Sequence, residues 1–258
     1  MYNLNIKIME SKTLGFIGGG RITRIFLQGL SNKNVRPQSI KVYEPDAATL
    51  EVLQADFPEV DAADSAAGAA TQHVVFMAVH PPIVMETLQK IKDAVSENTI
   101  VISLAPKITI EKMVSMLPAG KIVRMIPNAT SFINKGYNPV TFDNRFDKKE
   151  KKQVMRLLKK LGKTFETEEA KLESFAIISA MLPTYFWFQW QEMEKIGVDT
   201  GLTPEEAQKA VKSTLQKALK LYYNSGLSPD EVMDLIPVKP IGENEQEIKE
   251  ILYSKLMG

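Results

Sequence analysis

The stretch "TLGFIGGGRITRIFLQGL", residues 13–30, joins an apolar run to an amphipathic run through three consecutive glycines. The apolar part predicts a buried strand, and the spacing of apolar residues after the glycines predicts a helix. Glycine costs conformational entropy, so Gly18, Gly19 and Gly20 indicate a sharp turn in which side chains would be in the way.

A Gly-x-Gly turn between a strand and a helix is the setting in which backbone N–H groups bind a dinucleotide pyrophosphate. Arg21, in the first helical turn, opposes the helix dipole, and a bound anion would remove that conflict. Thr23 stands where Gly or Ala usually permits close helix–strand packing. We predict a dinucleotide site here; a tight turn that binds no ligand is the alternative.

Glu44 follows the second predicted strand, "IKVYE". An acid at that place usually accepts hydrogen bonds from the adenosine ribose and repels a 2′-phosphate, which favours NAD over NADP. Alternatively, Glu44 and Asp46 are solvated residues at a helix start, with Asp46 as the N-cap.

The composition of the 258 residues excludes several classes of function. A net charge of +1 gives no reason to expect nucleic acid or an anionic membrane as partner. The chain has no cysteine and only two histidines, so thiolate chemistry is excluded and a metal site is not expected. Without a signal-like start or an apolar run of roughly 18 residues, the chain is predicted to be cytoplasmic. Alternation of Leu4, Ile6 and Ile8 allows a short extra strand.

Strands and helices alternate over residues 1–168, which predicts a Rossmann-type doubly wound parallel sheet. The predicted strands are Leu14–Ile17, Ile40–Tyr43, Val74–Val79, Ile100–Ser103, Ile122–Met125, Val140–Phe142 and Thr164–Glu166. The predicted helices between them are Ile22–Leu30, Ala47–Phe57, Ile83–Ile91, Ile110–Met116 and Lys149–Leu161.

Residues 169–258 predict helices only, so the fold class is α/β followed by an all-helical C-terminal domain. The expected helices are Glu173–Ala180, Leu182–Ile196, Pro204–Ser225, Pro229–Leu235 and Glu245–Leu256. The helix over 182–196 carries many aromatic residues for a small domain, which favours a homodimer or higher homo-oligomer.

Three further segments follow predicted strands: "VVFMAVHPPIV" (74–84), "VISLAPKITIEKMVSMLP" (101–118) and "KIVRMIPNATSFINKGYNPVTF" (121–142). Together with "GFIGGGRI", their order and spacing resemble the pyrroline-5-carboxylate reductase family. The resemblance implies an N-terminal domain that binds NAD(P)H. It also implies a helical domain that exchanges helices with a second subunit to form the dimer and the active site.

The resemblance also implies site residues. The implied cofactor-binding residues, with Glu44 added from its position, are Gly18, Gly19, Gly20, Arg21, Ile22, Ala78, Val79, His80, Pro81 and Asn128. In the family's substrate-side helix start, Ser179, Pro183 and Tyr185 are matched.

The departures from the family pattern lie on the substrate side. The family's Ser-Pro-Gly-Gly-Thr-Thr loop, which binds the substrate carboxylate, corresponds here to "PVKPIGENE", 237–245, without Ser or Thr. Small polar residues are replaced by Ala180, Met181 and Leu182, and Pro106 and Lys107 stand where the family has small residues. A different substrate or a lost activity would explain these changes.

Hydride transfer to an iminium that arrives protonated needs positioning more than acid–base groups. The candidate catalytic residues are Asn128, Tyr185, Thr184 and Lys239, with Lys107 as a second cation for a carboxylate. Turn capping by Asn128, packing by Tyr185 and solvation of Lys239 are the structural alternatives, and His80 is expected near the cofactor but not as a base.

The sequence therefore predicts an NAD(P)H-dependent reductase of a small cyclic imine acid, as in proline biosynthesis. Two alternatives stay open: a related enzyme on another imine or keto acid, and a regulatory protein that binds the dinucleotide without catalysis.

Overall fold

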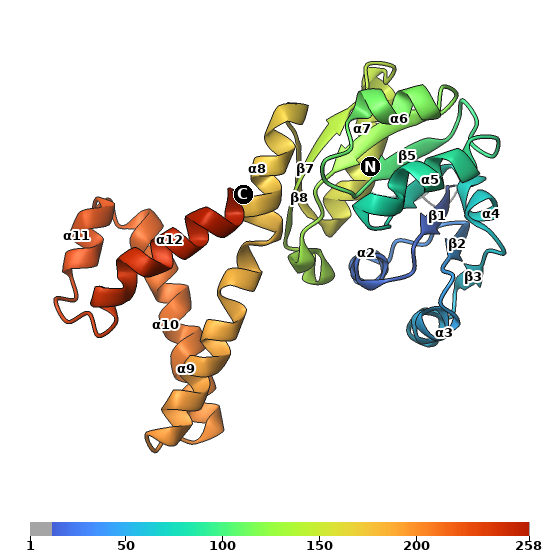
Figure 1. Cartoon of the computed structure of the whole chain (residues 1–258). Helices are drawn as coiled ribbons and strands as arrows, with labels where there is room; N and C mark the ends of the chain where they lie inside the picture. Colours follow the sequence, from blue (N-terminus) through green and yellow to red (C-terminus); the bar gives the residue numbers. More distant parts are fainter. Residues whose placement is uncertain (1–11, 258) are drawn as a thin grey trace, which may run out of the picture. The chain divides into compact units, whose positions relative to one another are not determined.

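The computed structural model describes residues 12–257, so the extra strand predicted at Leu4–Ile8 lies outside the described residues. The chain divides into two compact units, residues 1–181 and 182–258. Figure 1 gives the labels used below. The domain boundary expected after residue 168 falls within the first unit and stays a prediction.

The first unit is built on an eight-stranded sheet with the order β3-β2-β1-β4-β5-β6-β7-β8. All neighbouring strands are parallel except β6 and β7. The strands are β1 (Thr13–Ile17), β2 (Ser39–Tyr43), β3 (Val60–Ala62), β4 (Val74–Met77), β5 (Ile100–Ser103), β6 (Lys121–Met125), β7 (Gly136–Phe142) and β8 (Gly162–Glu166). The chain leaves β1 in one direction and returns beside it with β4, which makes the carboxyl ends of β1 and β4 a topological switch point.

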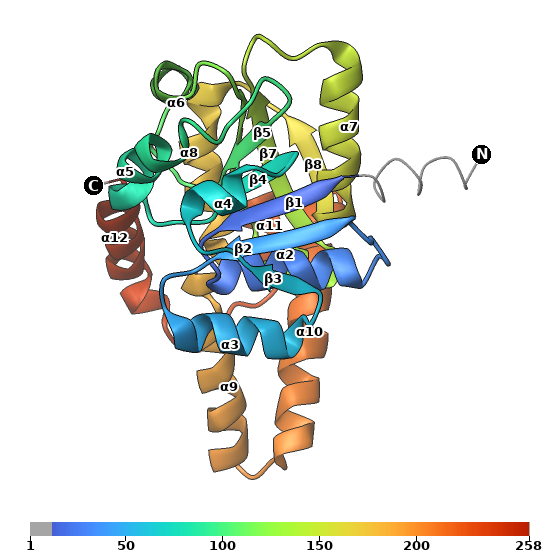
Figure 2. The ribbon, with the colours of Figure 1, turned by 90° about the vertical axis from the view of Figure 1, so that its right-hand side faces the viewer.

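Helices cover both faces of the sheet, as buried parallel strands require (Figure 2). One face packs against α2 (Arg21–Ser31), α3 (Ala47–Asp56) and α7 (Lys148–Leu158), and its core includes Phe16, Phe26 and Phe76. The other face packs against α4 (Ala66–Ala70), α5 (Pro81–Ile91) and α6 (Ile110–Met116). The predicted doubly wound class is confirmed.

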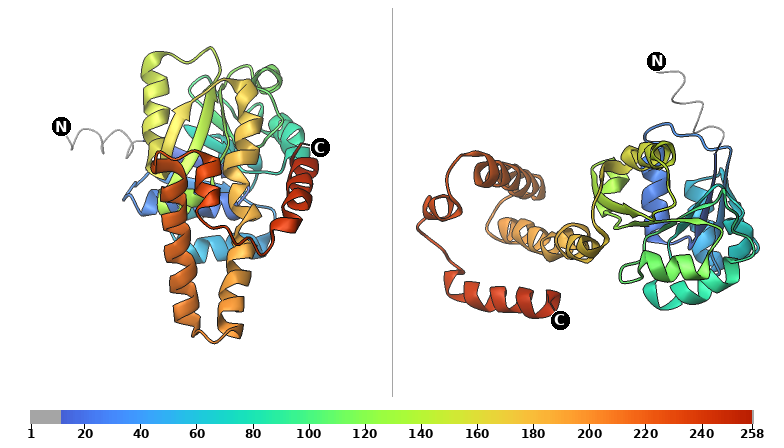
Figure 3. Two further views of the ribbon diagram at one scale, coloured as in Figure 1. Left: turned by 90° about the vertical axis from the view of Figure 1, so that its left-hand side faces the viewer. Right: turned by 90° about the horizontal axis from the view of Figure 1, so that it is seen from above.

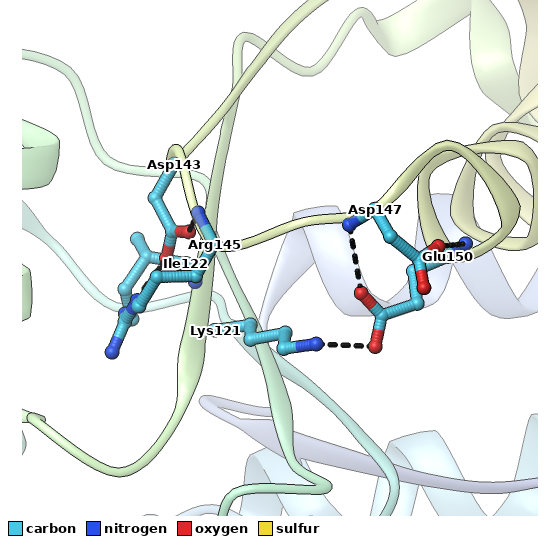
Figure 4. Close-up of polar contacts among 6 residues, drawn as sticks. All are labelled: Lys121, Ile122, Asp143, Arg145, Asp147 and Glu150. Atoms are coloured by element: carbon cyan, nitrogen blue, oxygen red, sulfur yellow. Dashed lines mark hydrogen bonds and ion pairs between the residues drawn. The ribbon is translucent and has the colours of Figure 1, made fainter.

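The reversal into antiparallel β7 is followed by a polar corner at the end of that strand (Figure 4). The buried carboxylate of Asp143 accepts hydrogen bonds from the Ile122 amide at 2.6 Å and from the Arg145 amide at 2.8 Å. Asp147 and Glu150 form a capping box that starts α7, and Lys121 pairs with Glu150. These contacts join the start of β6 to the segment after β7 and to the start of α7, and so stabilise this part of the sheet.

The first unit closes with short elements: η1 (Ala129–Ile133) after β6, η2 (Lys159–Leu161) after α7 and η3 (Glu169–Lys171) after β8. Next come α8 (Leu172–Phe175) and a π-helical turn, η4 (Ala176–Ala180), where one helix was predicted. The sequence missed β3 and α4. Each is at most five residues long, and the alanine-rich α4 carries too little periodicity to stand out.

The second unit is helical, as predicted: η5 (Leu182–Tyr185), α9 (Trp187–Asp199), α10 (Pro204–Asn224), α11 (Pro229–Asp234), η6 (Gly242–Asn244) and α12 (Glu245–Leu256). Helices α9 and α10 run side by side (Figure 3). Thr203 and Ser228 each form a capping box at the starts of α10 and α11. Ala207 is the one residue of this unit, among those described, that is buried.

Candidate cofactor site

The turn after β1 is possible only for glycine at its first two positions. Gly18 has φ +100°, and a Cβ there would lie 2.5 Å from the Ala78 carbonyl oxygen. Its N–H donates to the Tyr43 carbonyl oxygen at 2.8 Å, which holds the turn against the end of β2. A Cβ on Gly19 would lie 2.9 Å from the Glu44 side chain. The turn is therefore packed tightly between β2 and β4.

Gly20 differs from its neighbours. It has extended backbone as the N-cap of α2 and no side chain to cap the helix, and a Cβ on it would meet nothing within 4 Å. Protein atoms therefore do not fill the space in front of the first amides of α2. An open cradle before a helix N-terminus fits an anionic diphosphate, because the free N–H groups point outward there.

Thr23, at the position where Gly or Ala is usual, packs without conflict. Its hydroxyl is buried and donates to the Gly18 carbonyl oxygen at 2.6 Å. The Thr23 side chain thus stabilises the turn, because its hydrogen bond holds the carbonyl of Gly18, the residue with positive φ.

A cleft of about 780 Å³ extends from this turn across the carboxyl ends of β4, β5 and β6. Eight of the predicted cofactor-binding residues line it: Gly19, Gly20, Arg21, Ile22, Ala78, Val79, His80 and Pro81. Sequence reasoning did not assign the remaining lining, which includes Arg24, Asp46, Thr49, Leu104, Ala105, Pro106 and Pro127. Most of these follow predicted strand ends or start helices, and that position was the available signal.

The two acids after β2, Glu44 and Asp46, accept hydrogen bonds from backbone amides. Glu44 accepts hydrogen bonds from the Gly19 amide at 2.8 Å and from the Asp46 amide at 3.0 Å. Asp46 caps α3 through Thr49, as the alternative interpretation had it, and the hydrogen bonds from Thr49 lower the pKa of Asp46. Glu44 therefore lies against the glycine turn, with both carboxylate oxygens aimed at amides.

Cationic side chains lie on the first turns of α2. Arg21 lines the cleft and is exposed, and Arg24 lines it while pairing with Asp56 at 2.9 Å. No acid lies in the first turn of α2. The positive helix N-terminus and these two guanidinium groups make this end of the cleft suitable for a polyanion.

The segment after β4 forms the adjoining wall. Ala78 donates its amide to the Ile17 carbonyl oxygen at 2.8 Å, which ties this wall to β1. His80 is the N-cap of α5 without a side-chain capping bond, and Pro81 occupies the first turn, where its missing N–H costs nothing. The His80 ring is therefore exposed at the cleft.

Asn128 is buried at the end of β6, next to the cleft residue Pro127. Its Oδ1 accepts from the Thr130 amide at 3.0 Å, and its Nδ2 donates to the Ser179 carbonyl oxygen at 3.1 Å. The capping role that the sequence left open is thus present. A direct contact with the cofactor stays a prediction.

The other predicted catalytic residues belong to the second unit. Thr184 and Tyr185 lie in η5, and partial burial raises the pKa of the Tyr185 phenol above its ordinary value. Lys239 lies on a groove of about 320 Å³ with Ile241, Gly242, Glu245 and Ile248. The catalytic roles of Thr184, Tyr185 and Lys239 stay predictions.

Within residues 12–257, no group of three or more His, Cys, Asp or Glu side chains is arranged to hold a metal ion. None of the described helices has the length and apolar character needed to cross a membrane.

Comparison with known proteins agrees with this site. A family model described as "NADP oxidoreductase coenzyme F420-dependent" matches residues 13–107, the part that carries the glycine turn. The pyrroline-5-carboxylate reductase of Corynebacterium melassecola is 27% identical over 250 residues, covering 95% of this chain and 92% of the relative.

Two solved structures extend the match to the fold. The NADP-bound pyrroline carboxylate reductase of Plasmodium falciparum has a TM-score of 0.78 and 22% identity, with 96% of this chain and 95% of that chain covered. The enzyme of Coxiella burnetii has a TM-score of 0.69 and 25% identity, with 96% and 92% covered. The chain is thus a distant relative of the pyrroline-5-carboxylate reductases, 22–27% identical to them over most of its length. It is an NAD(P)-dependent oxidoreductase, and the cleft at the glycine turn fits an NAD(P) coenzyme.

Proposed function

We propose that this pyrroline-5-carboxylate reductase-like chain reduces a small cyclic imine that carries a carboxylate. The observation that carries the proposal is the continuity of the cleft, which joins the glycine turn to an apolar wall after β4 and β5. A dinucleotide whose diphosphate lies on the turn can place its nicotinamide along that wall. When bound, the reduced coenzyme supplies the hydride.

The residues of the chain would bind and orient the coenzyme. The amides after Gly19 and Gly20, with Arg21, would hold the diphosphate. Ala78, Val79 and Pro127 supply apolar surface that would exclude water from the reacting carbon, and a dry site strengthens the remaining polar contacts. An iminium that arrives protonated needs no general acid, so positioning of the two reactants would supply most of the catalysis.

Binding of the substrate is proposed for Asn128, Thr184, Tyr185 and Lys239. Tyr185 and Thr184 carry hydroxyls that can donate a hydrogen bond to the imine or its carboxylate. Lys239 would replace the missing Ser/Thr loop as the carboxylate-binding group, because 237–245 supplies no hydroxyl. Asn128 would orient the nicotinamide by exchanging one of its present hydrogen bonds.

The rewritten loop at 237–245 favours a second candidate, a related reductase on a different imine or keto acid. The same loop also motivates the third: a regulatory protein that binds the dinucleotide without turnover. Both retain the cofactor cleft and differ only in what happens after coenzyme binding.

We further propose that NAD is preferred over NADP, supported by Glu44 at the end of β2 and by Asp46 in the cleft. Two carboxylates there would repel a 2′-phosphate, although Arg21 and Arg24 at the same end favour one. Equilibrium binding of NADH and NADPH compares the two directly. Tighter binding of NADPH would reverse this preference.

A homodimer is proposed from the second unit. Trp187, Phe188 and Met193 on α9 are 46%, 64% and 52% exposed, and Tyr223 on α10 is 73% exposed. Apolar surface on this scale in one small unit indicates an interface, and a second copy of the chain is the partner that the family implies. We also propose a cytoplasmic location.

The function is tested by incubating the purified protein with NADH or NADPH and pyrroline-5-carboxylate, following oxidation of the coenzyme. Turnover supports the first proposal. Turnover only on another imine or a keto acid supports the second candidate, and coenzyme binding without turnover on any of them supports the regulatory protein.

A further inference from the structure

The loop between β5 and α6 contains one strained residue. Lys107 has φ +66° and is exposed, immediately after Pro106 in the cleft wall. Among the residues that the structure describes, the other non-glycine residues with positive φ are Asn34 and Asn134, and asparagine tolerates this conformation. A lysine gains nothing locally from it, so something outside the loop must hold it there.

The Lys107 amide is held by a carboxylate from another element. It donates a hydrogen bond to Oε1 of Glu173 on α8 at 2.8 Å. At the other end of the loop, the Ile110 amide donates to Oε1 of Glu169 at 2.7 Å. The chain over 107–110 is thus fixed at both ends by acids that follow β8, and α8 lies beside β7 in Figure 1.

One buried arginine positions both acids. Arg124 on β6 is 3% exposed; its guanidinium donates to Glu169 at 2.9 Å and to Glu173 at 2.7 Å, using one terminal nitrogen for each. Each bond ends on the oxygen that also accepts a loop amide. The Arg124 Nε, in contrast, is buried without a partner among the described residues. A buried cation with an unsatisfied donor is costly, so its retention points to a positioning role.

We propose that Arg124 and Glu173 are positioning residues for the coenzyme: they hold Lys107 left-handed and thereby preform the 104–106 wall of the dinucleotide cleft. The proposal uses the cofactor cleft and does not depend on which imine is reduced. Leu104, Ala105 and Pro106 contribute apolar surface to that wall, and Lys107 decides the direction in which the chain leaves it.

The test measures NADH and NADPH affinity of the full-length protein by coenzyme fluorescence. Glu173→Ala should weaken binding about tenfold, because the loop must then be ordered at the time of binding. Glu168→Gln is the matched control: this acid is in the same segment and pairs with Lys171 on the surface. It should bind the coenzyme as wild type does.

Rescue distinguishes positioning from a general loss of structure. Glycine adopts positive φ at no steric cost, so Lys107→Gly in the Glu173→Ala background should restore affinity to within about twofold of Lys107→Gly alone. A double variant as weak as Glu173→Ala would overturn the proposal, as would unchanged affinity in Glu173→Ala.

If Glu173→Ala fails to fold, Glu173→Gln keeps an acceptor for the Lys107 amide and loses only the charge that faces Arg124. Its affinity should then fall less than tenfold and recover in the same way with Lys107→Gly. No loss, or loss without recovery, would again overturn the proposal. If the wild-type protein binds neither coenzyme, the assignment of the cleft as a cofactor site is wrong, and this inference fails with it.

Discussion

The two units of this chain solve the burial of apolar side chains differently. In the first, a sheet with helices on both faces removes Phe16, Phe26 and Phe76 almost completely from solvent. In the second, α9 and α10 pack on each other but leave Trp187, Phe188 and Tyr223 largely exposed. The residues that line the cofactor cleft belong to the well-packed first unit, whereas the helical unit leaves large apolar side chains exposed.

Because of this difference, coenzyme binding and substrate binding are supported by different kinds of observation. The glycine turn is fixed by backbone packing, and its geometry alone indicates what binds there. The proposed substrate-side residues Thr184, Tyr185 and Lys239 lie in the unit whose apolar surface is exposed, and their roles rest on the proposed homodimer.

The largest effect is expected at Gly20. Gly20→Val should leave folding intact, since its Cβ points into open space, and should weaken NADH and NADPH binding by at least about 100-fold. The side chain would displace a diphosphate held by charge-assisted hydrogen bonds of about 1.5–3 kcal/mol each. Calorimetry measures the affinity and thermal unfolding checks the fold. Gly68→Ala on α4, with only ordinary contacts at 3.5 Å or more, is the control; retained affinity in Gly20→Val would place the coenzyme elsewhere.

The second experiment examines the exposed helices. Phe188→Asp should raise the dimer dissociation constant about 100-fold, because a charge would be buried where an aromatic anchor is expected. Sedimentation measures the oligomeric state. Ile133→Asp, at a side chain 61% exposed on the first unit, should leave it unchanged. A wild-type protein that is monomeric at micromolar concentration would contradict the proposed dimer interface on the helical unit.

The third experiment concerns coenzyme choice. Glu44→Ser should raise the affinity ratio of NADPH to NADH about tenfold, equal to about 1.4 kcal/mol, because one repulsive charge near the 2′-phosphate is removed. Titration with both coenzymes gives the ratio. Asp61→Ser removes an exposed acid of β3 as the control. An unchanged ratio in Glu44→Ser would mean that Glu44 acts only on the turn.

The smallest effect is expected at the start of α10. Hydrogen bonds from the Thr203 backbone and side chain lower the pKa of Glu206 below its ordinary value of 4.5. The stabilisation is therefore complete above that value and is lost as pH falls through the lower pKa of the folded state. Glu206→Gln should melt slightly below wild type at pH 7, and the difference should vanish in acid. Glu205→Gln, at a residue outside the capping box, is the control. If the difference in melting temperature between Glu206→Gln and wild type grows in acid, the predicted pH dependence is wrong.

Much of the fold followed from the sequence because its signals are local. The continuous apolar runs of β1, β4 and β5 and the Thr203 and Ser228 caps each predict their element within a few residues. The glycine turn likewise predicted the cleft lining after β1, and the family resemblance predicted the lining after β4. Short elements such as β3 escaped, since three residues carry no period.

Other features of the protein depend on contacts between residues far apart in the chain. Thr23 departs from the Gly or Ala usual at its position, and only the fold shows that its hydroxyl bonds to Gly18. Arg124 pairs with Glu169 and Glu173, which lie more than forty positions later in the chain. Periodicity and motifs record which backbone a segment prefers, because those preferences arise between near neighbours. Only packing determines which donor meets which acceptor when the segments come together.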